Sequence, residues 1–266
     1  MYETITLERE EGIGILTFNR PDMLNAMNFQ FVEDLHGAFD ELKRDLKTRV
    51  LILNGNGTAF CAGADLTIDT EKWPEDVGTL QKRYRMQQSF ASLSIRLREI
   101  PQPVIAAVHG PVVGGGLAMC AACDIRIADE TARFTGAMIK IGLSGGEMGA
   151  SWFLPRILGA SAAAEILYTG RFFDAKKALD LGFVSQMVEK GTHVDAAREI
   201  AREIMRNTPY GIRMTKELLN VSLDAPGLRH QIEIENRTQI LCTYAEDFNE
   251  SIEAFFEKRD PQYKDR

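Results

Sequence analysis

Cysteine, histidine and tryptophan are scarce in this chain of 266 residues, which holds four Cys, four His and two Trp. Four cysteines in a chain of this length do not form the disulfide framework of a small secreted protein. The histidines lie far apart in the sequence and show no H-x-x-x-H spacing: they are His36, His109, His193 and His230. We therefore expect no metal site and no metal-dependent catalysis.

The chain also lacks a long apolar run and a positively charged N-terminal leader. No uncharged apolar stretch approaches the roughly 18–20 residues that span a bilayer. The N-terminus, "MYETITLEREEG", carries acidic residues where a signal peptide carries basic ones. We expect a cytoplasmic protein that does not associate with membranes. The net charge of −7 argues against a nucleic-acid partner, because proteins that bind nucleic acids cluster Lys and Arg.

Nucleotide-binding signatures are missing as well. The sequence contains no G-x-x-x-x-G-K-[ST] motif, and no G-x-G-x-x-G follows a predicted strand. Gly114 and Gly116 form a G-x-G, but Met119 occupies the place of the third glycine. A dinucleotide cofactor is therefore not expected.

Short apolar strands are present and alternate with helical segments over most of the chain. Alternating apolar residues predict a β-hairpin over residues 4–18. Apolar runs predict strands at 50–54 and 104–108, and the segment "DIRIA" predicts a further strand at 124–128. Strands that feed helices through short glycine loops indicate an α/β fold with a parallel or mixed sheet.

Helical spacing of apolar residues predicts helices over 29–46, with Asn28 as N-cap, and around 80–98. From residue 174 on the pattern is almost purely helical. Within that region Thr192 and Asp195 form a predicted capping box, and Thr208 with Pro209 marks another helix start. The acidic stretch 67–78 has no clear period and is predicted to be a loop.

Two glycine-flanked turns carry the strongest indication of chemistry. "NGNGTAFCAGADL" (54–66) and "HGPVVGGGLAM" (109–119) each follow a predicted strand and lead toward a helix. Each turn could aim one backbone N–H at the same oxygen, which would make an oxyanion hole worth about 2.7–4 kcal/mol per donor. The alternative is that the glycines only let a helix pack closely on a strand.

Two further motifs have competing interpretations. Cys120 and Cys123 spell C-x-x-C, but they lie in an apolar helix, which favours a buried thiol pair over metal or redox chemistry. "GLSGG" (142–146) fits the G-x-S-x-G nucleophile elbow, with Ser144 as nucleophile and His193 or His230 downstream. The segment before it is a weak strand, so a serine hydrolase is a rival reading only.

Six segments together resemble one family over essentially the whole chain. They are "NRPDMLNAMN", "AFCAGADL", "PVIAAVHGPVVGGGLAMCAACDIRIAD", "FLPRILG", "YTGRFFDAKKALDLGFVSQMV" and "AFFEKRDPQY". The sequence resembles the crotonase superfamily, the enoyl-CoA hydratase/isomerase family. The resemblance implies an α/β fold built as a spiral of ββα units in residues 1–195, which carry the acyl-CoA site. It also implies a helical oligomerisation region in 196–266 and a homotrimer or a dimer of trimers (hexamer).

The resemblance also implies roles for particular residues. The amides of Ala64 and Gly115 would bind the thioester carbonyl of an acyl-CoA substrate, with the start of a helix adding its positive end at Gly115. Coenzyme A is carried by the substrate, so no separate cofactor is expected. The CoA channel would be lined, largely through backbone, by Asn25, Ala26, Met27, Ala62, Asp65 and Leu66. Arg20 could approach a phosphate, and Lys258 with Phe255 could contact CoA across a subunit boundary.

The sequence departs from the family pattern at the two glutamates of the hydratases. Those positions hold Ala118 and Met138, which puts a two-carboxylate hydration mechanism in doubt. Glu147 aligns with an aspartate that shuttles a proton in some isomerases of the family. The resemblance therefore implies isomerisation or hydration of an enoyl-CoA with Glu147 as acid and base, as part of fatty acid metabolism.

Two rival functions use the same scaffold, namely a CoA-thioester hydrolase with Glu147 activating water and a non-catalytic acyl-CoA binder. The acyl group is not specified by the sequence. Candidate pocket residues are Trp73, Tyr84, Met86, Met138 and Trp152, although such side chains are commonly plain core.

Overall fold

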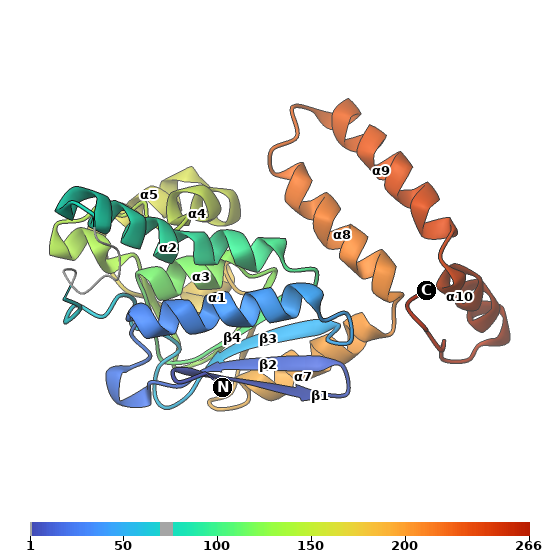
Figure 1. The fold of residues 1–266 in the computed structure, drawn as a ribbon, viewed down its shortest axis with the longest axis horizontal. Helices are drawn as coiled ribbons and strands as arrows, with labels where there is room; N and C mark the ends of the chain where they lie inside the picture. The colour runs from blue at the N-terminus through green and yellow to red at the C-terminus, as the bar shows by residue number, and fades with distance from the viewer. Residues whose placement is uncertain (1, 70–76) are drawn as a thin grey trace.

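A six-stranded sheet forms the centre of the protein in the computed structural model, which describes residues 2–69 and 77–266 (Figure 1). Its order is β1-β2-β3-β4-β6-β9, and only the β1–β2 hairpin is antiparallel. The strands are β1 Ile5–Glu10, β2 Ile13–Phe18, β3 Val50–Gly55, β4 Val104–Val108, β6 Ile125–Asp129 and β9 Gln186–Val188. The predicted hairpin and the three other predicted strands are confirmed.

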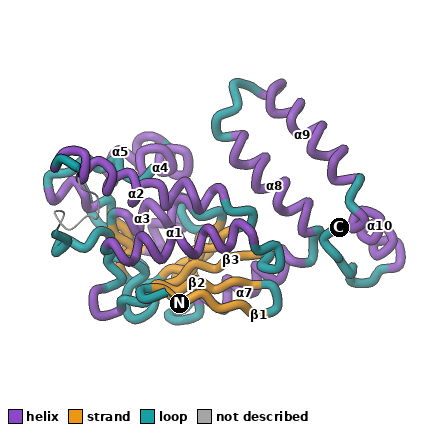
Figure 2. Tube along the Cα trace, viewed as in Figure 1, coloured by secondary structure: helices purple, strands orange, loops and turns teal. Residues whose placement is uncertain are grey.

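Both faces of this sheet are covered, which explains why its central strands are apolar throughout. On β3, Leu51 and Leu53 belong to one core cluster, whereas Val50 and Ile52 belong to another. Successive side chains of a strand point to opposite faces of the sheet. A strand whose two faces are both buried therefore needs an apolar residue at every position. Figure 2 shows helices above the strands and α7 below them.

The helices over the first face are α1 Phe29–Arg44, α2 Thr79–Glu99 and α3 Gly115–Ala122, and α7 His193–Met205 covers the second face. Asn28 caps α1 as predicted, because its side-chain oxygen accepts a hydrogen bond of 2.9 Å from the Phe31 amide. Residues 70–76 of the predicted loop lie outside the described residues.

A second, three-stranded sheet lies next to the loop that precedes α3. It has the order β5-β7-β8, with β5 Pro111–Val113, β7 Arg133–Thr135 and β8 Phe173–Asp174. The remaining elements of the main body are short: η1 Pro21–Met23, η3 Ala137–Ile141, α4 Ala150–Leu158, α5 Ala160–Thr169 and α6 Ala175–Asp180.

Three C-terminal helices project from the main body (Figure 1). They are α8 Pro209–Ser222, α9 Leu228–Thr243 and α10 Glu246–Glu257. The predicted boundary at residue 195 falls inside α7. Because Ala197 and Ala201 of α7 pack against the sheet, α7 belongs to the core, and the projecting region begins with α8.

The two predicted helix starts in this region have different outcomes. The Thr208 hydroxyl accepts a hydrogen bond of 3.1 Å from the Gly211 amide and caps α8, as predicted. The capping box at Thr192 is wrong. Thr192 precedes α7 with φ −97° and ψ 2° and makes no capping bond, because its hydroxyl donates instead to the carbonyl of Glu189 at 2.8 Å.

A buried lysine attaches α8 to the core. Lys216 is 5% exposed, and its Nζ donates to the carbonyls of Leu97 (3.1 Å) and Gln102 (2.7 Å). It also lies 3.2 Å from the carboxylate of Asp124, which pairs with Arg98 at 2.8 Å. Asp124 therefore has a structural role between the two cations. Since a buried charge is tolerated only when it is paired, this network fixes where α8 meets α2.

Candidate functional site

The two glycine-flanked loops lie side by side. The Cys61 amide donates to the Pro111 carbonyl at 3.2 Å, and the Val113 amide donates to the Cys61 carbonyl at 2.9 Å. A further backbone pairing joins Met27 to the first loop through its bonds to Gly63 (2.8 Å) and Asp65 (3.0 Å). These bonds hold the chain on both sides of Ala64 and place it next to the start of α3.

Ala64 and Gly115 each present a backbone N–H with no acceptor. Neither amide donates a hydrogen bond to any residue in the two described ranges. Gly115 is the first residue of α3, where a helix amide has no intrahelical partner. A methyl group placed on Gly63 would lie 3.6 Å from the Gly115 nitrogen, so the residue before Ala64 adjoins this amide. Ala64 is exposed, whereas Gly115 is buried.

The three consecutive glycines serve different purposes. Gly114 adopts φ 54° and ψ −115°, a region that side chains rarely enter. A methyl group on Gly116 would lie 2.5 Å from the Cys61 carbonyl oxygen, so this position allows close packing of the two loops. At Gly115 the nearest atoms are the flexible ends of Met27 and Met148. Close packing therefore explains Gly116, whereas a role for the Gly115 amide in an oxyanion hole stays a prediction.

Glu147 lies in the turn before α4 and is half-buried. Its Oε1 accepts a hydrogen bond of 3.1 Å from Nε2 of Gln87 on α2. The next residue, Met148, has φ 49°, and its Sδ would lie 2.9 Å from a methyl group on Gly115. Glu147 thus directly precedes Met148, the residue whose side chain adjoins Gly115 and its free amide.

Ala118 and Met138, which the resemblance aligns with the two hydratase glutamates, are apolar and buried in this chain. Ala118 is fully buried in α3, and Met138 is 5% exposed. The Met138 Sδ would lie 3.3 Å from a methyl group on Gly114, so its side chain adjoins the glycine run. Neither position therefore offers a carboxylate in this chain.

Two predicted CoA-channel residues, Asn25 and Asp65, take part in a network of hydrogen bonds and an ion pair that holds the first loop in place. Asn25 is fully buried with φ 56°, and its side chain bonds to the backbone of Arg20 and Ala59, at 2.8 Å each, and of Asn56. Arg20 pairs with Asp65 at 3.1 Å, so its charge is already neutralised within the chain. Burial raises the pKa of Asp65, but hydrogen bonds from Thr67 and Arg20 outweigh burial and lower it.

A family model described as enoyl-CoA hydratase/isomerase matches residues 8–266. The chain belongs to the enoyl-CoA hydratase/isomerase family. It is 33% identical, over 266 residues, to 1,2-epoxyphenylacetyl-CoA isomerase of Escherichia coli strain K12, covering 99% of each chain. The crystal structure of an enoyl-CoA hydratase from Bacillus anthracis is similar with a TM-score of 0.91 and 30% identity, covering 99% of this chain and 100% of that one.

An enoyl-CoA hydratase from Polaromonas sp. JS666 is similar at a TM-score of 0.89 and 28% identity, covering 98% of this chain and 99% of that one. The crotonase-type α/β fold with C-terminal helices is therefore confirmed. None of the described helices is long and apolar enough to cross a membrane. Within residues 2–69 and 77–266, no three His, Cys, Asp or Glu side chains gather as a metal site requires.

The other predicted CoA contacts of this family member differ in accessibility. Ala26 and Met27 are buried, and the Ala62 amide already donates to the Leu24 carbonyl at 2.9 Å, whereas Leu66 is 73% exposed. Lys258 and Phe255 belong to the end of α10, which Figure 1 shows at the opposite end of the molecule from α4 and α5. A contact from Lys258 to CoA at this site therefore requires another subunit.

The nucleophile-elbow hypothesis is wrong. The segment before Ser144 is the 3-10 helix η3 and not a strand, so the strand-to-helix turn that exposes a nucleophile is absent there. His193 stacks on His109 with ring centroids 4.7 Å apart and lies 3.5 Å from Asp129. His230 is exposed on α9.

Cys120 and Cys123 are buried thiols, as predicted. The Cys123 Sγ donates to the Met119 carbonyl at 3.3 Å. Burial raises the pKa of Cys120 to about 12 and raises that of Cys123 as well. Neither is a reactive thiolate at neutral pH.

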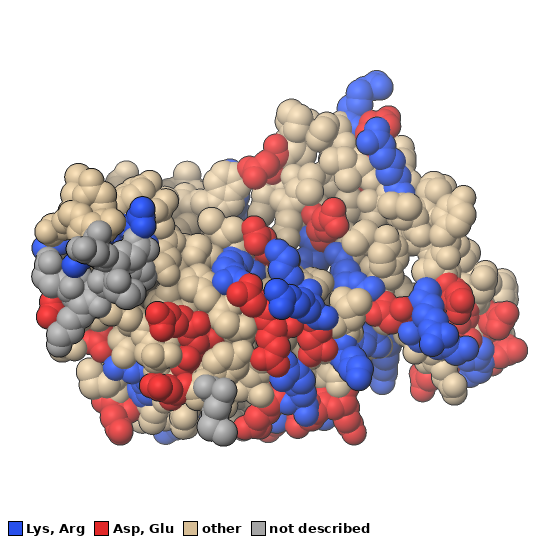
Figure 3. Space-filling view, viewed as in Figure 1, with Lys and Arg blue, Asp and Glu red and all other residues tan. Residues whose placement is uncertain are grey.

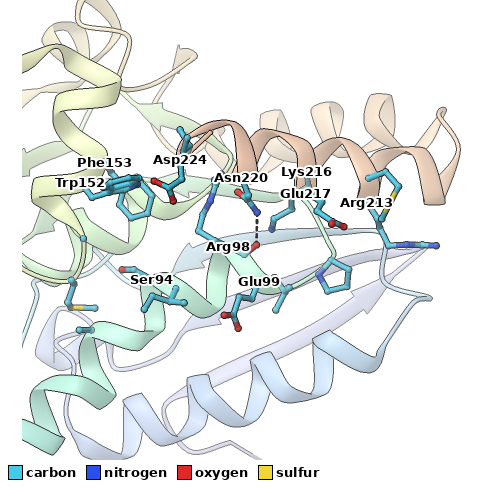
Figure 4. A pocket seen from close by; sticks show the side chains of 18 residues that line it. Ser94, Arg98, Glu99, Trp152, Phe153, Arg213, Lys216, Glu217, Asn220 and Asp224 are labelled. Atoms are coloured by element: carbon cyan, nitrogen blue, oxygen red, sulfur yellow. Dashed lines mark hydrogen bonds between the residues drawn. The ribbon is translucent and has the colours of Figure 1, made fainter. Parts of the chain in front are cut away.

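A cavity of about 700 Å³ adjoins the Glu147 turn between α2, α4 and α8 (Figure 4). Met148 and Gly149 form the part of its wall nearest Gly115. Trp152 lines it, as the sequence suggested. Of the other candidates, Tyr84 is 63% exposed and does not line this cavity, Met86 packs against the core, and Trp73 lies outside the described residues.

Proposed function

We propose that the protein binds an acyl-CoA thioester and stabilises its enolate with the backbone N–H groups of Ala64 and Gly115. Glu147 acts as the acid and base that moves a proton on the acyl chain. The observation that carries this proposal is the pair of free amides on adjoining loops, with Glu147 one residue from the Gly115 contact. Two donors that meet developing negative charge are the main requirement for removing a thioester α-proton.

The proposed reaction is double-bond isomerisation or hydration of an enoyl-CoA. In isomerisation, Glu147 takes a proton from one carbon, the electrons move into the thioester as an enolate, and the same carboxyl returns the proton to another carbon. One carboxylate suffices for this sequence. The apolar residues at 118 and 138 support isomerisation, as does the similarity to the 1,2-epoxyphenylacetyl-CoA isomerase of Escherichia coli. The substrate carries the only cofactor, CoA.

Gln87 supports the proposed role of Glu147. Its amide N–H occupies Oε1 of the carboxylate, which leaves Oε2 for the substrate. A hydrogen bond to one oxygen fixes the plane of the carboxyl group, and orientation of a base contributes strongly to its efficiency. We assign Gln87 as a positioning residue.

We also propose that the chain assembles through α9 and α10 into a homotrimer or a dimer of trimers. No residue of α9 is buried in the single chain. Leu228, Tyr244, Phe255 and Phe256 are each 77–83% exposed, and an apolar surface of this kind usually meets a partner. In Figure 3 uncharged surface is broader over α8 and α9 than over the lower face. Assembly would allow Lys258 of one subunit to reach CoA bound to another.

The test is turnover of enoyl-CoAs of different acyl size in deuterated water, followed by mass spectrometry. Deuterium incorporation without added water mass indicates isomerisation, and a gain of water indicates hydration. Glu147→Gln keeps the shape and the Gln87 contact but removes the base, so we expect turnover to fall by 100-fold or more, about the 10²–10⁴ that general bases contribute. Glu130→Gln, at an exposed position, is the matched control. Unchanged turnover in Glu147→Gln contradicts the proposal, and release of free CoA indicates a hydrolase.

A further inference from the structure

The cavity of about 700 Å³ lies directly behind the proposed reaction site. Met148 forms its wall and also adjoins Gly115, so one side chain separates the cavity from the free amide. Met148 holds φ 49°, a conformation that costs a non-glycine residue about 1–2 kcal/mol. Strained residues of this kind concentrate at functional sites. A thioester held at Ala64 and Gly115 could extend past Met148 into the cavity.

Aromatic and aliphatic side chains form much of the cavity wall. Trp152 and Phe153 lie on one side of it in Figure 4, and Ala91 and Ile95 of α2 also line it. The guanidinium of Arg156 lies 3.2 Å from the centre of the Trp152 ring, which holds the indole in place by a cation–π contact. A volume of this size is typical of sites that take drug-sized ligands. The flat walls suit a ring.

The charges at the cavity wall do not favour an anion. Arg98 and Lys216 are both paired with Asp124, and Arg213 is paired with Asp265 at 2.6 Å. Of the acidic residues at the wall, Glu217 and Asp224 form no ion pair with any described residue. The wall thus offers no free cation to a carboxylate or phosphate, whereas it does offer free carboxylates. An anionic occupant of this cavity is therefore disfavoured.

Two buried polar atoms in the wall lack a hydrogen-bond partner among the described residues, namely the Ser94 hydroxyl and Oδ1 of Asn220. Ser94 is 2% exposed and lines the cavity, and its hydroxyl has no hydrogen bond within the described part of the chain. Ser92, two residues earlier on the same helix, instead donates to the Ser89 carbonyl at 2.8 Å. A buried hydroxyl without a partner costs about 1–3 kcal/mol. A ligand oxygen in the cavity would supply the partner that this hydroxyl lacks.

We propose that this cavity receives the acyl group of the substrate and selects an uncharged, ring-sized acyl group with an oxygen substituent that hydrogen-bonds to Ser94. This inference rests on the proposed acyl-CoA function and names the substrate class for that site. Trp152 supplies the flat contact for the ring, and Ser94 recognises the oxygen.

The test measures dissociation constants of saturated CoA thioesters, which have no double bond to isomerise or hydrate. The probes are acetyl-CoA, phenylacetyl-CoA, 4-hydroxyphenylacetyl-CoA and the carboxyl-terminated glutaryl-CoA. We expect the hydroxylated ring to bind about fivefold more tightly than the plain ring, the value of one hydrogen bond. Glutaryl-CoA should bind no better than acetyl-CoA.

Two variants separate the contributions. Ser94→Ala should abolish the preference for the hydroxylated ring and leave phenylacetyl-CoA unchanged, whereas the control Ser92→Ala keeps the preference. Trp152→Ala should weaken both ring thioesters about tenfold without affecting acetyl-CoA. Circular dichroism verifies that each variant folds.

Equal affinities for all four thioesters would overturn the proposal, as would a preference that survives Ser94→Ala. Equal affinities are also the result expected if a segment of a second copy fills the cavity. These binding results are independent of the Glu147→Gln turnover assay. Loss of selectivity with intact turnover contradicts only this inference, and selective binding without turnover contradicts only the proposed reaction.

Discussion

Substitution of Gly116 by alanine tests whether the closeness of the two loops matters for activity. The added methyl group would lie 2.5 Å from the Cys61 carbonyl oxygen and 2.8 Å from the Cys61 Cβ, whereas ordinary contact begins at 3.4 Å. The obstruction includes backbone, so no side-chain rotation relieves it. The Cys61 loop and α3 must move apart by about 1 Å, and Ala64 moves with the loop.

Two effects of different size follow. Overpacking of this kind costs about 1–3 kcal/mol of the free energy of unfolding. A displacement near 1 Å at a positioning group lowers turnover by roughly 100-fold. We expect Gly116→Ala to fold with a lower urea midpoint and to lose most of its turnover.

The assays are urea denaturation followed by circular dichroism and steady-state turnover of an enoyl-CoA. Gly227→Ala is the matched control, because a methyl group there has nothing within 4 Å and the backbone is extended at φ 169°. Wild-type turnover in a stably folded Gly116→Ala would refute the reasoning, since it would mean that the spacing of the loops does not position the two amides.

Three further substitutions test other parts of the account. Gln87→Ala should lower kcat about fivefold with KM unchanged, because only the orientation of Glu147 is lost; Gln88→Ala is the control, and a change confined to KM would contradict a positioning role. His193→Asn should reduce the decrease in the free energy of unfolding that accompanies a fall in pH. Burial, and then the neighbouring imidazole, lower the pKa of His193 below 6.5, so stability is full above about pH 6.5 and is lost as pH falls from there through the lowered folded-state pKa; urea midpoints at pH 8 and pH 5.5 measure it, and an unchanged difference between them refutes the assignment. Lys216→Met should cost about 3 kcal/mol and expose α8 amides to hydrogen exchange before those of β4; uniform exchange across the chain would show that Lys216 does not anchor α8.

The secondary structure that depends on local pattern was predictable from the sequence. The apolar run at 50–54 predicts a strand, and Asn28 caps α1 because an asparagine side chain can reach the amide three residues on. Thr192 also precedes a helix and has a side chain that can cap it, but its hydroxyl donates to the Glu189 carbonyl instead. Sequence alone does not show whether such a side chain bonds to the helix or to the preceding turn.

The arrangement of the site depends on contacts between distant residues, which local patterns do not encode. Gln87 and Glu147 are 60 residues apart in the sequence, and Arg20 and Asp65 are 45 apart. No periodicity pairs them. The family resemblance identified Ala64, Gly115 and Glu147, but only the structure brings Met148 onto Gly115 and places the cavity beside it.

The central claim is that the amides of Ala64 and Gly115 bind one carbonyl oxygen. A crystal structure of the protein with a saturated acyl-CoA tests it most directly. The account predicts a thioester oxygen at about 2.7–3.1 Å from both nitrogens. A thioester bound elsewhere, or an oxygen that contacts neither nitrogen, would contradict it.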